Sequence, residues 1–136
     1  MIYRITEEAI DSNALLAEIT VETAGAIVTF HGIARRFSHG RDILYLEYAA
    51  YDSMALTVLQ QIGAEIYAQF EIERIAIVHR TGRVNIGETS IVIAVAAAHR
   101  QAALNGCSYA IERIKQILPV WKKEVWQDGA EWLQGV

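Results

Sequence analysis

The stretch from Ala94 to Trp126 constrains the fold most, because it joins a strand, a helix and a second strand with almost no linker. Within residues 101–118, apolar side chains follow helical spacing at Ala103, Cys107, Ala110, Ile111, Ile114, Ile117 and Leu118. We therefore expect one face of a helix over 101–118 to pack on a core. Pro119 ends this helix, since its ring fixes φ and disfavours helical geometry in the preceding residue. Residues 120–126 then form a second strand, and Asp128-Gly129 favours a tight hairpin turn after it.

The start of this helix carries two cationic residues where a polar cap is expected. No Ser, Thr, Asp or Asn occurs from Ala96 to Arg100. His99 and Arg100 mark the boundary instead, at a helix end whose dipole disfavours cations. Free backbone N–H groups beside an arginine indicate an anion site, and a solvated helix start is the alternative. Lys115 is about four turns away, so either the ligand is long or a second copy of the chain supplies one end of it.

Length and composition restrict the class of protein. At 136 residues, the chain is expected to form a single domain over residues 1–136, with a core large enough to need no disulfide or metal. One cysteine excludes an intrachain disulfide and gives no metal-ligand pattern. The apolar runs are shorter than the roughly 18–20 residues of a membrane-spanning helix. The first residues lack the apolar centre of a signal peptide. We expect a cytoplasmic protein without membrane segment, metal or cofactor.

The charged residues are unevenly distributed. The net charge of −4 argues against general nucleic-acid binding, which usually needs a basic face. Seven of the twelve lysines and arginines nevertheless fall in short stretches, at Arg35, Arg36, Arg41, Arg100, Lys115, Lys122 and Lys123. A locally basic pocket in an acidic protein suits a small phosphorylated ligand better than a polynucleotide.

The other elements follow from hydrophobic periodicity and turn residues. Strands are expected over residues 2–5, 24–34, 43–49, 72–80 and 89–97. A long amphipathic helix is expected over 53–70, capped by Asp52 or Ser53, and a short one over 13–19, capped by Ser12, after a first helix start at Thr6. Residues 35–42 and 81–88 are expected to be loops. The order of elements predicts an α+β fold with mostly antiparallel strands and two main helices.

Five segments of the chain carry a family resemblance. They are GAIVTFHGIAR (25–35), VHRTG (78–82), IGE (86–88), AHR (98–100) and KQILPVWKKE (115–124). In this order they resemble the large, catalytic subunit of molybdopterin synthase, over roughly residues 25–132. The combination of AHR with the lysine-rich segment is specific, whereas each segment alone would be weak.

The resemblance implies a fold, an activity and partners. The fold is an α/β-hammerhead-type core, and the assembly is a homodimer that binds two small ubiquitin-like sulfur-carrier subunits. The activity is the insertion of two sulfurs into cyclic pyranopterin monophosphate, which makes the dithiolene of molybdopterin. The sulfur donor is the thiocarboxylated C-terminal glycine of the small subunit. This sequence ends in WLQGV rather than Gly-Gly, so we expect it to be the receiving subunit.

The resemblance also assigns roles to individual residues. Lys115 and Lys122 match the two lysines implicated in catalysis, and their spacing across Pro119 agrees. Arg35 matches an arginine of the substrate pocket. Ile33 and Ala34 match pocket positions beside it, although Ile33 replaces a residue that is often basic in relatives.

The His99–Arg100 pair matches residues expected to bind substrate from the neighbouring protomer, which would resolve their separation from Lys115. A core histidine bound by backbone is the alternative for His99.

The chemistry of lysine suits the implied reaction. An ammonium group can bind a carboxylate or thiocarboxylate, and it can donate a proton when a neighbour lowers its pKa. Lys122 and Glu124 share one face of the expected strand, which favours a charged Lys122, whereas Lys123 points the other way. The expected substrate-binding set is Ile33, Ala34, Arg35, His99, Arg100, Lys115, Lys122, Lys123 and Glu124. The sequence leaves open which lysine acts as the acid.

Further residues and functions stay open. Cys107 is expected in the core, His39 could face ligand from its loop, and Tyr48 and Tyr51 could line a groove. One alternative function is a non-catalytic module that binds a ubiquitin-like protein, with the lysines only docking its carboxylate. Another is a phosphodiesterase that uses His99 and a lysine on a cyclic phosphate.

Overall fold

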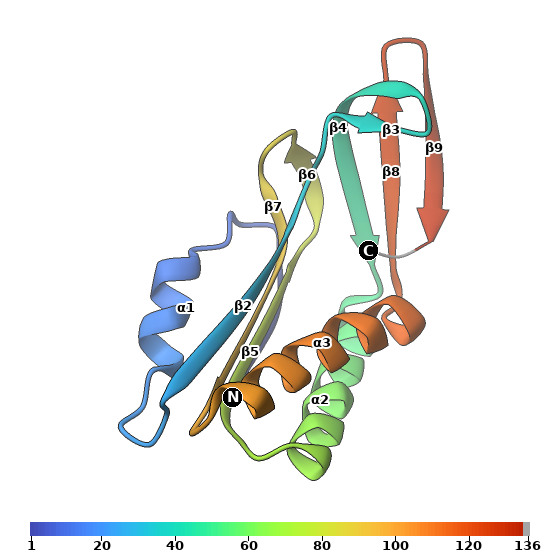
Figure 1. The fold of residues 1–136 in the computed structure, drawn as a ribbon. Coiled ribbons are helices and arrows are strands. Elements are labelled where there is room, and N and C mark those ends of the chain that lie inside the picture. The colour runs from blue at the N-terminus through green and yellow to red at the C-terminus, as the bar shows by residue number, and fades with distance from the viewer. Residues whose placement is uncertain (135–136) are drawn as a thin grey trace.

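The computed structural model describes residues 1–134, so the last two residues of the expected 1–136 domain lie outside the described part. The elements along the chain are β1 (Ile2–Thr6), α1 (Ser12–Ile19), β2 (Ala26–Ile33), β3 (Phe37–Ser38), β4 (Arg41–Ala50), α2 (Asp52–Gln69), β5 (Ile72–Arg80), β6 (Gly82–Asn85), β7 (Thr89–Ala97), α3 (Arg100–Ile117), β8 (Val120–Trp126) and β9 (Gly129–Gln134) (Figure 1). This arrangement confirms the expected α+β class with its two main helices. Within residues 1–134, none of the helices has the length and apolarity to cross a membrane.

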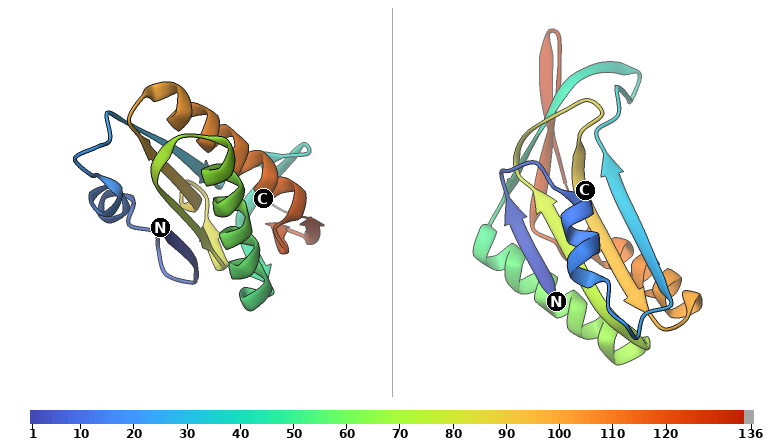
Figure 2. Two further views of the ribbon diagram at one scale, coloured as in Figure 1. Left: turned by 90° about the horizontal axis from the view of Figure 1, so that it is seen from below. Right: turned by 90° about the vertical axis from the view of Figure 1, so that its left-hand side faces the viewer.

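The first sheet has the order β1-β5-β7-β2 and is covered on both faces. The helix α1 lies on one face, while α2 and α3 lie on the other (Figure 2). Because both faces are buried, β5 and β7 are nearly continuous apolar runs rather than alternating ones. The pairing is antiparallel except between β1 and β5.

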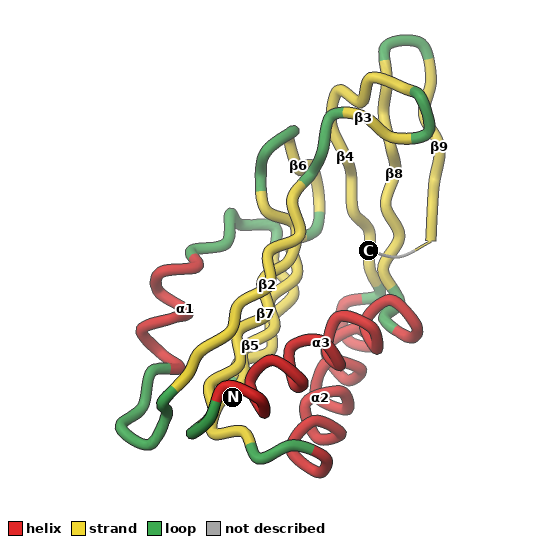
Figure 3. The backbone as a smooth tube through the Cα atoms, viewed as in Figure 1, coloured by secondary structure: helices red, strands yellow, loops and turns green. Residues whose placement is uncertain are grey.

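The second sheet has the order β3-β4-β8-β9, and β6 pairs with β4 along the edge opposite β8. This sheet extends beyond the C-terminal end of α3 (Figure 1). The expected turn from helix to strand at Pro119 is confirmed. Leu118 donates its N–H to the Ile114 carbonyl at 3.0 Å, and β8 begins two residues later (Figure 3). The turn therefore holds the end of α3 directly against the start of β8.

Three local expectations about helix starts were wrong. The chain bends after Thr6, whose hydroxyl accepts the Glu8 N–H at 3.1 Å, so this polar pattern forms a local turn instead of a helix. The cap of α1 is Asp11, which accepts the Ala14 N–H at 3.1 Å, and Ser12 is the first helical residue. The N-cap of α2 is Tyr51, without a side-chain hydrogen bond.

Both expected loops contain short strands. In residues 35–42, β3 pairs with β4 through a two-residue turn at His39 and Gly40, which both have positive φ, 52° and 76°. In residues 81–88, β6 pairs with β4, and its Val84 is completely buried. Each strand depends on β4 for its hydrogen bonds, so periodicity within such short segments could not reveal it.

The expected hairpin at Asp128-Gly129 is confirmed, with Trp126 paired to Gly129. The glycine is needed here for space rather than for a positive φ. A Cβ atom on Gly129 would lie 2.6 Å from the indole Nε1 of Trp126.

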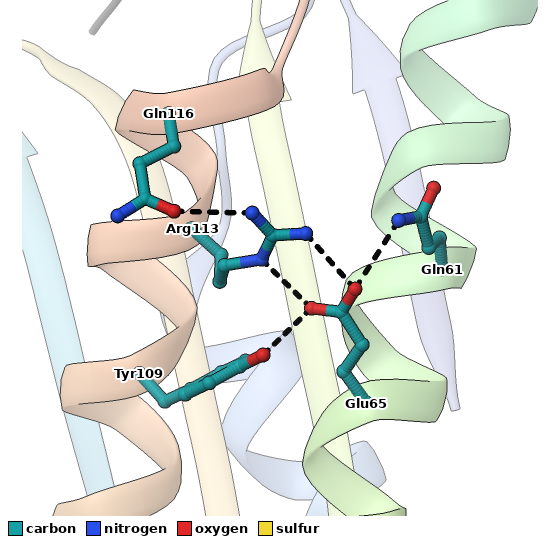
Figure 4. A network of polar contacts seen from close by, with 5 residues as sticks. All are labelled: Gln61, Glu65, Tyr109, Arg113 and Gln116. Atoms are coloured by element: carbon teal, nitrogen blue, oxygen red, sulfur yellow. Dashed lines mark hydrogen bonds and ion pairs between the residues drawn. The ribbon is translucent and has the colours of Figure 1, made fainter.

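A polar network fixes α3 against α2 (Figure 4). The Arg113 guanidinium donates to both Glu65 oxygens, at 2.8 and 3.0 Å, and the Tyr109 hydroxyl donates to Oε1 at 2.8 Å. These bonds, that of Arg113 above all, lower the pKa of Glu65 to about 2. The network therefore holds the helix that carries Lys115.

Candidate functional site

A cleft of about 370 Å³ opens where α3 and the two sheets meet. Six elements and the segment after β2 contribute its walls, through Phe30, His31, Gly32, Ile33, Arg35, Ser38, Leu46, Tyr48, Ser90, Ile111, Lys115, Lys122 and Glu124. Residues far apart in the sequence thus converge on one cavity. The cleft combines cations, aromatic rings and one buried carboxylate.

Lys115 and Lys122 both line this cleft, although one is on a helix and the other on a strand. Lys115 lies in the last turn of α3, where the helix dipole favours a cation. The positions of both lysines are fixed by completely buried neighbours, Ile114 in the helix and Val120 in the strand. The structure therefore brings together the two lysines that the sequence singled out.

Glu124 lies on the same wall as Lys122, and its residue is only 2% exposed. Its Oε1 is buried without a hydrogen-bond partner. Within residues 1–134, the ion pairs found to Glu124 include His39, at 3.6 Å between Nδ1 and Oε1, and do not include Lys122. The sequence placed Glu124 and Lys122 on one face, but the burial of Glu124 was not expected. His39 approaches this carboxylate from the turn between β3 and β4 but is not among the residues that line the cleft, so its contact with a ligand stays a prediction.

Behind the cleft wall, His79 packs against Tyr48, with ring centroids 5.1 Å apart at 68°. His79 is completely buried and donates from Nδ1 to the Arg80 carbonyl at 2.7 Å, so its Nε2 is an acceptor, and this atom has no partner. Burial lowers the pKa of His79 to about 4, against the opposing effect of that hydrogen bond. Burial also raises the pKa of Tyr48, against the opposing effect of Ser90. Neutral rings therefore back this side of the cleft.

The positions at the end of β2 and directly after it divide between cleft and core. Arg35 and the half-exposed Ile33 line the cleft. Ala34 is 2% exposed and packs in the core instead. Lys123 lies on the opposite face of β8, 3.9 Å from a carboxylate oxygen of Glu47, and is not among the cleft residues.

His99 and Arg100 are exposed at the opposite end of α3. At 1.5 Å per residue, Arg100 lies about 22 Å along the helix from Lys115. His99 lines a separate depression of about 180 Å³ that also contains Glu71 and Glu73. In one chain, this pair does not meet the two lysines. The absence of a side-chain cap at His99, expected from the sequence, is confirmed.

Two other candidates lie outside the cleft. Cys107 is buried in the core as expected, and burial raises the pKa of its thiol to about 11. Tyr51 packs on Trp121, with ring centroids 5.5 Å apart, rather than on the cleft. Of the two tyrosines proposed for the groove, Tyr48 alone is among its lining residues.

Sequence reasoning missed seven wall residues, which are Phe30, His31, Gly32, Ser38, Leu46, Ser90 and Ile111. Phe30 and His31 fall inside the GAIVTFHGIAR segment, so the segment itself was the signal that could have found them. Ser90 carried no such signal, because the sheet pairing alone brings it beside Gly32, whose carbonyl accepts its hydroxyl at 3.2 Å.

The chemistry available in the cleft is anion binding combined with recognition of a flat, polar group. Arg35 and the two lysines can bind a phosphate or a carboxylate, and an ammonium can also transfer a proton. Phe30 and Tyr48 offer aromatic surface to a ring system. Among residues 1–134, no three His, Cys, Asp or Glu side chains group closely enough to hold a metal ion.

Comparison with known proteins identifies close relatives. The family of the MoaE protein matches residues 5–117. The molybdopterin synthase catalytic subunit of Bacillus subtilis is 47% identical over 131 residues, which cover 96% of this chain and 83% of that protein. The crystal structure of molybdopterin synthase from Staphylococcus aureus has a TM-score of 0.91 at 41% identity, and covers 96% of this chain and 95% of that one.

A more distant structure shares the fold alone. It is the complex of subunits 1 and 2 of the molybdopterin-converting factor from Helicobacter pylori, which matches with a TM-score of 0.79 at 23% identity over 94% of this chain and 87% of that chain.

Proposed function

The chain belongs to the MoaE family of molybdopterin synthase catalytic subunits, enzymes of molybdenum cofactor biosynthesis, and from this premise we propose that it inserts two sulfur atoms into cyclic pyranopterin monophosphate. The product would be the dithiolene of molybdopterin. The observation that carries the proposal is the meeting of Lys115 and Lys122 in one cleft with Arg35. This set supplies positive charge for both an anionic substrate and an anionic sulfur donor.

The proposed sulfur donor is the thiocarboxylated C-terminal glycine of a small ubiquitin-like subunit. Two observations support a second subunit. The Helicobacter pylori structure is a complex of two subunits of the molybdopterin-converting factor, one of which has this fold. In addition, the ammonium groups of Lys115 and Lys122 suit the negative charge of a thiocarboxylate.

In each proposed cycle, the thiocarboxylate sulfur attacks a carbon of the substrate and replaces the oxygen that this carbon carries. The carbon–oxygen bond breaks, the oxygen leaves with the bonding electrons and takes up a proton, and the substrate becomes joined to the donor glycine through a thioester. Water then cleaves the bond between the acyl carbon and the sulfur. The sulfur stays on the substrate, and the donor leaves with an ordinary carboxylate. Lys115 assists by transferring a proton or by stabilising the developing charge, and Lys122 holds the tail. Two donors complete the dithiolene.

We further propose that the active assembly is a homodimer with two small subunits, in which His99 and Arg100 of one protomer bind substrate at the other protomer's cleft. This part of the proposal is supported by the exposure of both residues at a helix start without a side-chain cap. Free N–H groups at such an end suit a phosphate. Their distance from Lys115 in one chain favours a site shared by two chains.

A single reaction mixture tests the proposed function. Purified protein is combined with cyclic pyranopterin monophosphate and a thiocarboxylated carrier subunit, and the products are analysed by mass spectrometry. Formation of the dithiolene is the expected result. Carrier binding without turnover would indicate a binding module instead, and opening of the cyclic phosphate without sulfur would indicate a phosphodiesterase.

A further inference from the structure

Tyr48 is a cleft residue to which the proposed mechanism gives no role. It lies on β4 directly opposite Lys122 on β8, so the two side chains project from the same face of the second sheet, and both line the cleft. Cross-strand neighbours have Cβ atoms about 4.5–5.5 Å apart. A group that the Lys122 ammonium holds is therefore within reach of the Tyr48 hydroxyl.

The Tyr48 ring is held firmly by its surroundings. The residue is only 6% exposed, and its ring packs edge-on against the completely buried His79, with centroids 5.1 Å apart. Burial raises the pKa of Tyr48 and so does the charge of Glu124, against the opposing effect of Ser90. The hydroxyl thus stays protonated, and the packed ring presents it in a constant place, as stabilisation of a transition state requires.

The other hydroxyl groups of the cleft wall already have partners. Ser90 donates its proton to the Gly32 carbonyl at 3.2 Å, and Ser38 Oγ lies 3.1 Å from Nδ1 of His39. Among the hydroxyls that line the cleft, that of Tyr48 is therefore the best placed to donate to a ligand.

A neutral donor adds something that the cleft lysines lack. An ammonium attracts a thiocarboxylate before the reaction as well as any anion formed during it, and only the difference between the two speeds a chemical step. A hydroxyl interacts weakly with a neutral carbonyl and about twice as strongly once that oxygen is charged. Tyr48 is therefore suited to a step in which a neutral carbonyl becomes an oxyanion.

We propose that Tyr48 is a catalytic residue of the second half of each cycle, in which its hydroxyl donates a hydrogen bond to the oxyanion formed as water attacks the thioester. The proposal rests on the proposed function, because the thioester belongs to that mechanism. The observation that carries it is the place of this hydroxyl beside Lys122, which is proposed to hold the donor tail.

The step balances as follows. Water adds to the acyl carbon and gives up one proton, and the carbonyl oxygen takes an electron pair of its double bond and becomes the oxyanion. The carbonyl then re-forms as the carbon–sulfur bond breaks. Sulfur keeps the bonding electrons and stays on the substrate as a thiolate. The second proton of the water is lost, and the donor glycine becomes a carboxylate.

The test compares Tyr48→Phe with wild type and with Tyr45→Phe as a matched control. Tyr45 lies on the opposite face of the same strand, 3.9 Å below the guanidinium carbon of Arg83, and is not among the cleft residues. Each protein reacts with cyclic pyranopterin monophosphate and thiocarboxylated carrier in a single turnover that is quenched with acid at intervals. Intact mass then separates the covalent carrier–substrate adduct from the free carrier carboxylate, so each half of the cycle is timed by itself.

Tyr48→Phe is expected to form the adduct at nearly the wild-type rate and to hydrolyse it about a hundredfold more slowly, the effect of losing one donor to an oxyanion. The adduct should accumulate in Tyr48→Phe and stay scarce in wild type and Tyr45→Phe. Hydroxylamine, which cleaves thioesters, should release the carrier from the accumulated adduct.

Two results would overturn the inference. One is hydrolysis of the adduct at the wild-type rate in Tyr48→Phe. The other is equal slowing of both halves of the cycle, because a general loss of cleft geometry would affect them alike. Failure of the proposed function is seen separately, as a wild-type protein that forms neither adduct nor dithiolene, and the role of Tyr48 falls with it.

Discussion

At the scale of single residues, the two cleft lysines lie in different surroundings. Lys115 is on a helix fixed by the packing of Ile114 and by the Arg113–Glu65 pair, which favours a constant catalytic geometry. Lys122 lines the cleft from a strand that also carries Glu124, and its ammonium group can pair with an anion in the cleft. Lys115→Ala should therefore lower the single-turnover rate of sulfur transfer by several powers of ten at saturating carrier, with carrier affinity nearly unchanged. Lys122→Ala should instead weaken carrier or substrate binding by roughly 1–3 kcal/mol.

A charge-preserving change separates two possible roles of Lys115. Arginine keeps the positive charge but cannot readily give up a proton. If Lys115 transfers a proton, Lys115→Arg should be nearly as slow as Lys115→Ala in single-turnover experiments. Glu112→Ala, an exposed change on the same helix, serves as the control and should react at the wild-type rate. Near-normal sulfur transfer by Lys115→Arg would mean that only the charge of this residue matters.

His79 should make the protein less stable in mild acid. Its pKa is about 4 in the folded state and about 6.5 when unfolded. Between these values the unfolded chain binds the proton and the folded chain does not, so its contribution to stability is present above pH 6.5 and is lost as the pH falls towards 4. The loss between pH 6.5 and 4.5 should be about 2 kcal/mol.

Urea unfolding of wild type and His79→Phe across this pH range measures this contribution. The phenylalanine variant should show a pH dependence that is flatter by that amount, even if it is less stable overall. Glu65 titrates in both proteins, so its effect cancels in the comparison. Equal slopes for the two proteins would contradict the buried, neutral state of His79.

At the scale of elements, the sequence was most informative where a segment's pattern is complete in itself. The helix α3 has six apolar positions on one face, its C-cap Leu118 continues them, and Pro119 follows, so both α3 and β8 were predicted nearly to the residue. The strands β3 and β6 were missed because their few residues become strands only by pairing with β4. The cap of α1 was misplaced because Asp11 and Ser12 are neighbouring polar residues that can both fill the role. The cap of α2 was misplaced because its N-cap Tyr51 makes no side-chain hydrogen bond, so the polar residues after it are no guide.

The pairing of α2 with α3 leads to a prediction at the same scale. Glu65 accepts a two-pronged bond from Arg113 and a third bond from Tyr109, and the side chains of Glu65 and Arg113 are about three-quarters buried. Glu65→Gln should lower the free energy of unfolding by about 1–2 kcal/mol, more than an exposed ion pair would. Glu112→Gln on the exposed side of α3 should have little effect.

A double-mutant cycle with Arg113→Met isolates the pair in urea unfolding experiments. Losses that simply add, with no coupling between Glu65 and Arg113, would show that the network does not hold the two helices together.

At the scale of the whole molecule, the cleft exists only because the two sheets meet at the end of α3. The lysines could be singled out through the family resemblance and their spacing, but their meeting with Tyr48 and Ser90 depends on sheet pairing between distant segments. The burial of Glu124 is likewise a product of this junction, since strand alternation predicts a face and not its depth. Ala34 shows the reverse case, because a residue beside two cleft residues turns into the core.

The separation of Arg100 from Lys115 gives the last prediction, at the level of assembly. Lys115→Ala and Arg100→Ala chains should each be inactive alone. If each site takes its lysine from one protomer and its arginine from the other, a mixed dimer contains one fully wild-type site and one doubly altered site. Random mixing makes about half the dimers mixed, so about a quarter of the wild-type activity should return. The variants are unfolded and refolded together, and mixed dimers are verified by mass. If verified mixed dimers stay inactive while wild-type protein treated identically recovers, both residues act within one chain or Arg100 does not bind substrate.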